Sequence, residues 1–257
     1  MLWFKRLPQA WAEAACLFER EHHRRVASVL EALDADALLA QRCLFGGGTA
    51  LALRHGEYRE SVDIDFLVSY REGYGQLRQA LTGAEGINAL TRPGKLLAQT
   101  RDMRADQYGI RTMLRVEGVE IKFEIVLEGR LTLDPPGVDD RICGVAVLTP
   151  LDAAACKLLA HSDRWRDDAT VCRDLIDLAM MAPPKKLLRQ AIDKAALAYG
   201  ASIEADLSTA IQHLREHPQR LDKCMQAMRI TAVPKAVLWQ RIKALGPRKT
   251  SANPAPP

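Results

Sequence analysis

Two aspartates, Asp63 and Asp65, stand one residue apart in an apolar run and could bind a metal ion together. In a β-strand, successive side chains alternate between the two faces and each residue advances about 3.3 Å, so these carboxylates would share one face, roughly 6 to 7 Å apart at the backbone. Val62, Ile64 and Phe66 would share the other face and pack inward. Carboxylate oxygens arranged in this way suit hard cations such as Mg²⁺ that bind together with substrate phosphates. We therefore expect a metal site on this strand.

A glycine-rich turn precedes the two aspartates within the same stretch, residues 43–68. A turn of this kind that opens a helix presents backbone N–H groups to anions. Gly47 and Gly48 would let a phosphate approach the backbone closely, and the Thr49 hydroxyl would add a donor. The turn has neither the lysine of a Walker A loop nor the spacing of a dinucleotide-binding fingerprint. We expect it to bind phosphate as part of a different kind of site.

Residues 110–126 alternate between apolar and polar side chains, which predicts a β-hairpin that turns at Glu117 and Gly118. On the second strand the apolar side chains point one way and the charged side chains the other: Ile121, Phe123 and Ile125 against Glu120, Lys122 and Glu124. Glu124 is the candidate for a third metal ligand, and Glu120, on the same face, is its rival. Lys122 is expected to form a cross-strand type of ion pair with Glu124.

The chain changes near Pro150 from strands to nearly continuous helix. Thr149, Pro150 and Asp152 form a strong helix start, with an N-cap, a proline at the first helical position and an acid three residues after the cap. We predict helices over residues 8–39, 70–86, 150–162, 168–181, 185–199, 202–216, 218–229 and 234–245, from the apolar periodicity and its breaks. On helix 168–181 the buried stripe is Cys172, Leu175, Ile176 and Ala179, and Arg173, Asp174 and Asp177 are expected to lie off it.

The composition indicates a globular protein, because 257 residues with 48% hydrophobic side chains can form a sizeable core. The six cysteines show no zinc-binding spacing, so we expect reduced thiols in a cytoplasmic protein. The longest run without a charge, Cys43 to Leu53, holds 11 residues, and a bilayer crossing needs about 20. No membrane association is expected.

Basic charge is concentrated at the C-terminus. Between Arg220 and Lys249 there are eight Lys or Arg residues and the single Asp222; this net charge of +7 leaves −3 for the rest of a chain whose total is +4. Such a patch favours a polyanion such as RNA, although helices also carry solvated basic faces.

The motifs taken together resemble a known signature. A Gly47-Gly48-Thr49 turn, then Arg59-Glu60-Ser61, then Asp63-Ile64-Asp65 is similar to the signature of the DNA polymerase β-like nucleotidyltransferases, in the form found in the AbiEii/AbiGii toxin family. That family also has a lysine-bearing helix and a [KR]-D-x-x-D-L helix, matched here by Lys157 and by residues 173–178. The resemblance covers about residues 40–180. The chain departs from the superfamily by having Thr49 in place of serine and Glu124 where aspartate is commoner.

The resemblance implies an enzyme that transfers a nucleoside monophosphate from an NTP to an acceptor hydroxyl, with pyrophosphate as the leaving group. Two Mg²⁺ ions, with Mn²⁺ as an alternative, would be held by Asp63, Asp65 and Glu124, and Glu124 would also accept the proton of the acceptor. The nucleotide would be bound by the turn, by Ser61 and by Lys157, which would neutralise the triphosphate; Asp174 would orient Lys157 or act on the acceptor. A toxin of this kind implies an antitoxin protein as partner and tRNA or another RNA as acceptor.

The resemblance also implies an α+β fold: a polymerase-β-like nucleotidyltransferase head, with a mixed sheet flanked by helices, followed by an all-helical C-terminal part. We expect a nucleotidyltransferase domain at 1–148, a helical domain at 149–245 and a flexible tail at 246–257. Two other functions are consistent with the same residues: a nucleotidyltransferase that modifies a protein or a small molecule, and an inactive protein that binds NTP or RNA.

Several site residues also have ordinary structural interpretations. These are an exposed helix lysine at Lys157, an i, i+4 pair between Arg173 and Asp177, an anchor of the loop onto the strand at Arg59, surface positions for His22 and His23, and local packing for His55 and His161.

Overall fold

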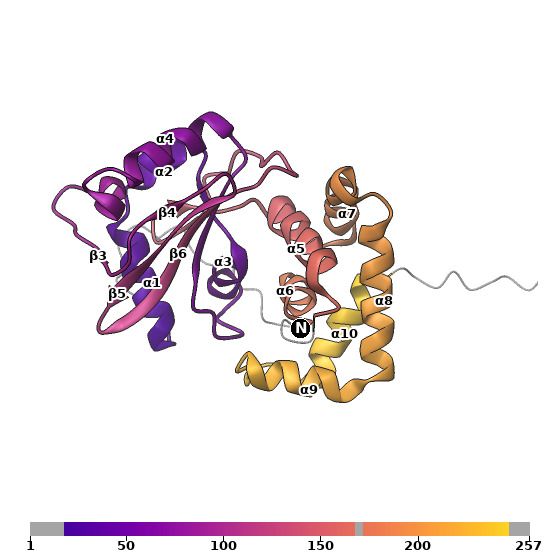
Figure 1. Cartoon of the computed structure of the whole chain (residues 1–257). Coiled ribbons are helices and arrows are strands. Elements are labelled where there is room, and N and C mark those ends of the chain that lie inside the picture. The colour runs from indigo at the N-terminus through magenta and orange to yellow at the C-terminus, as the bar shows by residue number, and fades with distance from the viewer. Residues whose placement is uncertain (1–17, 168–171, 247–257) are drawn as a thin grey trace, which may run out of the picture.

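The computed structural model describes residues 18–167 and 172–246. The first half contains a mixed sheet flanked by helices, and the second half contains helices α5 to α10 (Figure 1). This is the α+β architecture expected from the sequence, with the helical part C-terminal.

The head begins with two helices, α1 (Glu21–Ala32) and α2 (Ala35–Ala40), where one helix over 8–39 was predicted. The helix breaks because Leu33 is extended and the Asp34 carboxylate caps α2 by accepting from the N–H groups of Asp36 and Ala37. Residues 8–17 of the predicted helix lie outside the described part of the chain.

The sheet of the head has the strand order β1-β2-β6-β5-β3, with β4 also paired to β5. Its long strands are β2 (Ile64–Val68), β5 (Gly109–Val116) and β6 (Val119–Leu127), and β1 (Leu44–Phe45), β3 (Ala98–Gln99) and β4 (Arg104–Ala105) are short. β2 and β6 run parallel, and the other pairs are antiparallel. The predicted hairpin of β5 and β6 is confirmed: Glu117 and Gly118 form its turn, both with positive φ.

The remaining head elements are α3 (Gly47–Arg54), α4 (Arg71–Leu81), a 3₁₀ helix at Gly86–Leu90, and the ribbon of β7 (Arg141–Ile142) and β8 (Val145–Ala146). The helix predicted over 70–86 therefore ends at Leu81.

One face of the sheet is apolar and forms the main core of the head. Ile64, Phe66 and Phe123 on this face are fully buried against α1, α2 and α4. Val62 was expected to join them, but its side chain is 47% exposed because β2 begins only at Ile64. The opposite face carries Asp65, Lys122 and Glu124 and looks toward the helical half.

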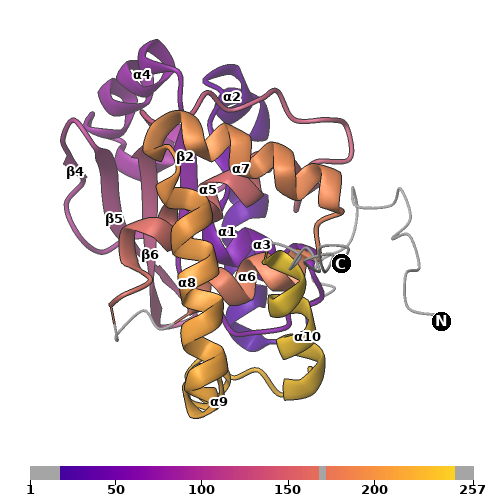
Figure 2. The same cartoon turned by 90° about the vertical axis from the view of Figure 1, so that its right-hand side faces the viewer.

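The helical half consists of α5 (Pro150–Arg164), α6 (Arg173–Met181), α7 (Lys185–Tyr199), α8 (Ser202–Glu216), α9 (Pro218–Ala227) and α10 (Lys235–Leu245). α5 starts as predicted, with Thr149 as N-cap and Pro150 at the first helical position. α7 and α8 pack on α5, and α10 packs on α6 (Figure 2). A second core joins these helices and reaches into the head at Ala52 and Tyr58.

The expectation that all cysteines are reduced is wrong for one pair. Cys172, just before α6, is disulfide-bonded to Cys224 on α9, with 6.8 Å between their Cα atoms. The two residues are 52 positions apart, so their spacing in the sequence carries no signal of the bond. Cys43, Cys143 and Cys156 are buried or half-buried thiols, as expected.

No described helix is both long enough and apolar enough to cross a membrane.

Candidate functional site

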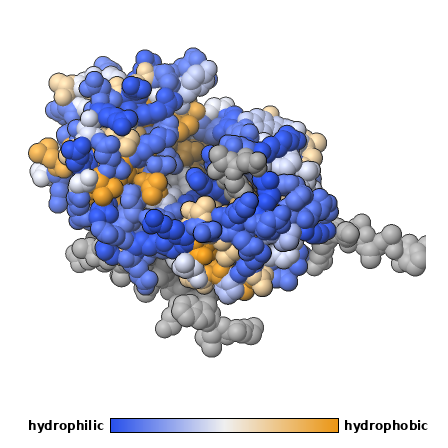
Figure 3. Space-filling view, turned by 60° about the horizontal axis from the view of Figure 1, so that its bottom comes forward, coloured by the Kyte–Doolittle hydropathy of each residue, from blue (hydrophilic) through white to orange (hydrophobic). Residues whose placement is uncertain are grey.

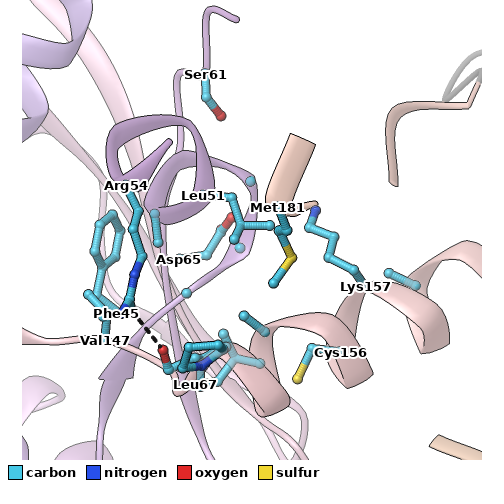
Figure 4. Close-up of a pocket in the computed structure, with 18 of the residues that line it drawn as sticks. Phe45, Leu51, Arg54, Ser61, Asp65, Leu67, Val147, Cys156, Lys157 and Met181 are labelled. Carbon is cyan, nitrogen blue, oxygen red and sulfur yellow. Dashed lines mark hydrogen bonds between the residues drawn. The ribbon is translucent and has the colours of Figure 1, made fainter. Parts of the chain in front are cut away.

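The two halves of the molecule enclose a cavity of about 410 Å³. The head contributes the α3 turn and the charged face of the sheet, and α5, α6 and α7 contribute the other wall. Figure 4 shows Asp65 and Lys157 on opposite sides of it, with Leu51 and Met181 between them. All predicted site residues therefore border this cavity except Thr49 and Asp174, which contact Ser61 and Lys157 at its edge.

The acidic part of the cavity lies where β2 and β6 run side by side. Asp65 and Glu124 are register partners on these parallel strands, so they are neighbours on one face of the sheet. Asp63 stands just before β2 and also borders the cavity. Glu120 lies four residues before Glu124 on β6, where it bonds to Thr100 and Arg115. Of the two glutamates, the structure brings Glu124 to the aspartates.

Glu124 is already bound by two cations. Its Oε1 accepts from Arg111 Nε at 2.7 Å, and its Oε2 accepts from Lys122 Nζ at 2.5 Å, so the expected Lys122 ion pair is confirmed. Burial raises the pKa of Glu124, but Lys122 and Arg111 outweigh it and hold the pKa below the ordinary value. Among the described residues, no group of three or more His, Cys, Asp or Glu side chains is arranged to hold a metal ion.

Asp63 and Asp65 are in a different situation. Neither forms an ion pair with any described residue. Burial, followed by the charge of Asp63, raises the pKa of Asp65 to about 6. The Asp65 carboxylate therefore lies close to a second acid in a largely desolvated place where no described residue forms an ion pair with it, so a bound cation would favour its charged form.

The glycines of the turn are required by packing inside the protein. Gly47 has a φ of +66°, and a Cβ atom there would lie 2.6 Å from Asp65 Oδ2. A Cβ atom on Gly48 would lie 2.0 Å from Arg59 Nη2. From the sequence, the glycines are expected to let a phosphate approach the backbone. The structure shows in addition that the backbone of the turn packs directly against Asp65 and Arg59.

Thr49 connects the turn to the segment that carries the aspartates. Its side chain is buried, and its hydroxyl donates to the Asp63 carbonyl oxygen at 2.5 Å and lies 2.8 Å from Ser61 Oγ. The hydroxyl is therefore used within the protein, whereas Ser61 itself borders the cavity.

Lys157 lies inside a buried ionic cluster and is 7% exposed, so an ordinary exposed helix lysine is excluded. Its Nζ is 3.0 Å from Asp174 Oδ1 and 2.7 Å from Asp177 Oδ2. Burial lowers the pKa of Lys157, but Asp177 and Asp174 outweigh it and the pKa is raised. The pKa of Asp174 is held well below its usual range, because Lys157 and Arg164 outweigh the upward effect of burial.

The prediction that Asp174 and Asp177 lie off the buried stripe of α6 is wrong, since both are buried. Asp177 is fully buried and pairs with Arg59, which donates from Nε at 2.7 Å and from Nη2 at 3.0 Å. The alternative pair of Arg173 with Asp177 is therefore wrong. Arg59 anchors its loop, but onto α6 and not onto the strand.

Two residues of this cluster were missed as site residues from the sequence, Tyr58 and Asp177. The Tyr58 hydroxyl donates to Asp177 Oδ1 at 2.6 Å. Asp177 belongs to the R-D-x-x-D-L motif of residues 173–178, and its place in that motif is the signal that could have identified it as a site residue. Nothing in the sequence around Tyr58 distinguishes it from a core tyrosine.

His22 and His23 were expected on the surface, but His23 is fully buried and His22 is half-buried. His23 Nδ1 is 2.7 Å from Glu57 Oε1, and Nε2 accepts from the Ser61 N–H at 3.1 Å, an arrangement that assigns the proton to Nδ1. Burial lowers the pKa of His23 more than Glu57 raises it. The neutral ring thus ties α1 to the segment before Asp63.

His55 and His161 fit the expected role of local packing. Burial lowers the pKa of His55 to about 4 and lowers that of His161.

The basic C-terminal segment is partly neutralised where the structure describes it, up to residue 246. Lys235 pairs with Asp222 at 2.6 Å, and Arg229 pairs with Glu60 of the head at 2.5 Å. Arg248 and Lys249 lie outside the described residues. The face seen in Figure 3 is mostly hydrophilic and carries separate, small hydrophobic patches.

The chain was compared with known families, curated proteins and solved structures. Residues 28–248 match the family described as "Nucleotidyl transferase AbiEii toxin, Type IV TA system". No curated protein sequence matches. The fold is similar to the crystal structure of a provisionally assigned nucleotidyltransferase from H. pylori, with a TM-score of 0.50, 18% identity, and coverage of 87% of this chain and 92% of that one. The family match spans most of the chain, and the chain belongs to the AbiEii nucleotidyltransferase toxin family of type IV toxin–antitoxin systems.

Proposed function

We propose that this enzyme transfers a nucleoside monophosphate from an NTP to an acceptor hydroxyl in RNA, most directly tRNA, in the cytoplasm. In this reaction the acceptor oxygen bonds to the α-phosphorus, the bond from that phosphorus to the bridging oxygen of the β-phosphate breaks, pyrophosphate leaves, and the hydroxyl proton is released. The observation that carries the proposal is the pair Asp63 and Asp65, which lie beside the glycine turn, without a bonded cation, in a cavity between the two halves.

The donor set of Asp63 and Asp65 fits Mg²⁺, because the pair offers hard oxygen ligands, and burial together with the charge of Asp63 raises the pKa of Asp65. When bound, Mg²⁺ would neutralise the triphosphate and polarise the reacting phosphate. Mn²⁺ is the alternative ion. Glu124 is the third acid of the proposed site, where Lys122 and Arg111 each donate to one of its oxygens and leave a second lone pair on each oxygen for a metal.

The proton of the acceptor is a separate question. In the sequence-based interpretation Glu124 accepts it, but the lowered pKa of Glu124 makes this carboxylate a weak base while both of its cations stay bound. We propose that Glu124 orients the acceptor or the metal and takes up the proton only after that pairing changes.

The nucleotide would lie along the α3 turn. We propose that the backbone N–H groups at Gly47 and Gly48 and the hydroxyl of Ser61 face the triphosphate, with Thr49 holding the turn in shape through Asp63. Lys157 faces the same cavity, and Asp174 holds its amine. Two carboxylates already share the charge of Lys157, so its attraction for the triphosphate is reduced.

Family membership implies an antitoxin as partner. The RNA acceptor rests on weaker support, namely the basic C-terminal segment, of which Lys235 and Arg229 are paired.

The test is pyrophosphate release from each of the four NTPs with Mg²⁺, with and without total RNA. We expect release with one preferred NTP that depends on RNA, and a labelled product that ribonuclease destroys and protease does not. Protease-sensitive labelling would assign a protein acceptor. NTP binding without pyrophosphate release under any condition would contradict the proposed activity and favour an inactive binding protein.

A further inference from the structure

Seven Lys or Arg side chains of the described residues border the cavity, and six of them are held by carboxylates of the protein. Arg54 bonds to Asp140, Arg59 to Asp177, Lys122 to Glu124, Arg130 to Glu128 and Asp163, Lys157 to Asp174 and Asp177, and Arg164 to Asp174. Each of these cations already has a counter-ion at hydrogen-bond distance. Their charges and donors are largely used within the protein.

Arg173 is the exception among the described residues. It borders the same cavity, its side chain is exposed, and it forms no ion pair or side-chain hydrogen bond with any described residue. Its neighbour Asp174 is the nearest carboxylate along the chain, but both oxygens of Asp174 are taken by Lys157 and Arg164. The guanidinium of Arg173 therefore keeps its full donor capacity at the edge of the cavity.

The charges left without a partner in this cavity are complementary to a metal-bound phosphate. Within residues 18–167 and 172–246, Asp63 and Asp65 have no bonded cation and Arg173 has no bonded anion. A ligand that satisfies both must carry positive and negative charge in one unit, as a divalent cation bound to phosphates does. A guanidinium suits the negative part because its planar fork can donate two hydrogen bonds to phosphate oxygens.

We infer that Arg173 is a phosphate-binding residue of the substrate site, the cation that Lys157 was predicted to be. The inference rests on the proposed function, since it assigns the substrate phosphate to a residue of the same cavity. The phosphate belongs either to the NTP or to the backbone of the RNA acceptor. The NTP and the RNA backbone offer the same kind of phosphate oxygen, and the experiment below distinguishes between them.

The experiment measures binding, so that it does not depend on turnover. Titration calorimetry with each NTP, in Ca²⁺ to suppress turnover, gives the affinity for nucleotide, and fluorescence anisotropy with labelled tRNA gives the affinity for RNA. The variants are Arg173→Gln and Arg173→Lys. Arg71→Gln is the matched control, because Arg71 is also an exposed arginine at the first position of a helix, α4, and lies outside the cavity.

We expect Arg173→Gln to weaken the binding of one probe by about ten-fold or more, since a charge-assisted hydrogen bond contributes at least that much to affinity. Arg173→Lys should recover part of the loss, because it keeps the charge without the fork. Arg71→Gln should bind both probes as the wild type does. A loss for NTP assigns the triphosphate, and a loss for tRNA assigns the acceptor backbone.

Unchanged binding of both probes by Arg173→Gln would overturn the inference, as would an equal loss in Arg71→Gln. Thermal unfolding of each variant identifies a loss that comes from misfolding; if Arg173→Gln is unstable, the decision passes to Arg173→Lys, which must then bind one probe more weakly than the wild type. The proposed function fails separately: it fails if the wild type binds these probes and releases no pyrophosphate with Mg²⁺.

Discussion

At the scale of single residues, the α3 turn shows how the protein uses glycine for contact with its own side chains. Arg59 Nη2 occupies the space where a Cβ atom of residue 48 would stand. The guanidinium cannot move away easily, because Asp177 holds it by two hydrogen bonds in a buried place. The shape of the turn therefore depends on an ion pair formed with a helix of the other half.

Replacement of Gly48 by alanine tests this packing. We expect Gly48→Ala to lower the free energy of unfolding by about 1 to 3 kcal/mol, the usual cost of forcing extra atoms into a packed site. Gly75→Ala is the matched control, since Gly75 lies within α4 with no atom near its added Cβ, and alanine there favours the helix by about 0.5 to 1 kcal/mol. Urea unfolding of both variants measures the difference, and equal stabilities would refute the packing argument.

At the scale of elements, the contact between α6 and the loop before β2 rests on a charged residue. Asp177 receives Arg59, Lys157 and Tyr58 and is 0% exposed. Charges buried this deeply are tolerated because they are paired, and the removal of one partner leaves the others without compensation.

Asp177→Asn should therefore cost about 3 to 5 kcal/mol of unfolding free energy, the range found when one member of a buried ion pair is removed. The control is Asp193→Asn on α7, where Asp193 pairs with Arg189 at 3.1 Å but both side chains are more than half exposed; a loss below about 1 kcal/mol is expected there. If denaturant titration gives similar losses for both variants, the Asp177 cluster does not stabilise the contact between the halves.

The same elements indicate what a sequence can and cannot reveal. The bounds of α7 and α8 follow from local signals, since a proline precedes α7 and apolar residues repeat at helical spacing in both, and the predicted ranges agree with the structure. The hairpin of β5 and β6 follows from alternation and a Glu-Gly turn. Burial of Asp177 and His23 does not follow, because a charged residue on a helix is usually solvated and its partners, Arg59 and Glu57, are far away in the sequence.

For the candidate site, too, some features could be predicted from the sequence and others could not. The positions of Asp65 and Glu124 could be predicted, because the alternation of β2 and β6 fixes which face each side chain shares. The pairing of Lys122 with Glu124 could be predicted as well, but the pairing of Arg164 with Asp174 and of Arg59 with Asp177 could not, since these contacts join residues 10 and 118 positions apart. For this reason the sequence motifs predict Lys157, and not Arg173, as the cation that binds the substrate phosphate.

At the scale of the whole molecule, the two halves share the cavity, and the second core extends into the head at Ala52 and Tyr58. We keep the division into domains at 1–148 and 149–245 as a proposal. Three histidines, His23, His55 and His161, should make the protein less stable as the pH falls, because all have lowered pKa values in the folded protein, whereas the raised pKa of Asp65 acts in the opposite direction.

Each of these histidines is neutral when folded and binds a proton on unfolding once the pH falls below about 6.5, the ordinary pKa. The stability they contribute is therefore present above pH 6.5 and is lost as the pH falls toward the folded pKa. For His55, with a pKa of about 4, the loss between pH 7 and pH 5 is about 2 kcal/mol.

Urea unfolding at pH 7 and at pH 5 gives the free energy of unfolding at each pH, and the difference between the two checks this value. His55→Gln should reduce the pH-dependent loss by about 2 kcal/mol, the share assigned to that residue. The control His217→Gln changes an exposed histidine at the end of α8. An unchanged loss in His55→Gln would show that His55 is not the source.

The central claim is that Asp63 and Asp65 hold the metal that nucleotidyl transfer needs. The most direct measurement is the rate of NTP-dependent labelling of total RNA by the wild type, Asp65→Asn and the control Asp193→Asn, over a range of Mg²⁺ concentrations. We predict that Asp65→Asn lowers the rate on the order of a thousand-fold, because metal stabilisation of the transition state is worth several kcal/mol, and that Asp193→Asn retains the wild-type rate. Labelling by Asp65→Asn at the wild-type rate would contradict the account.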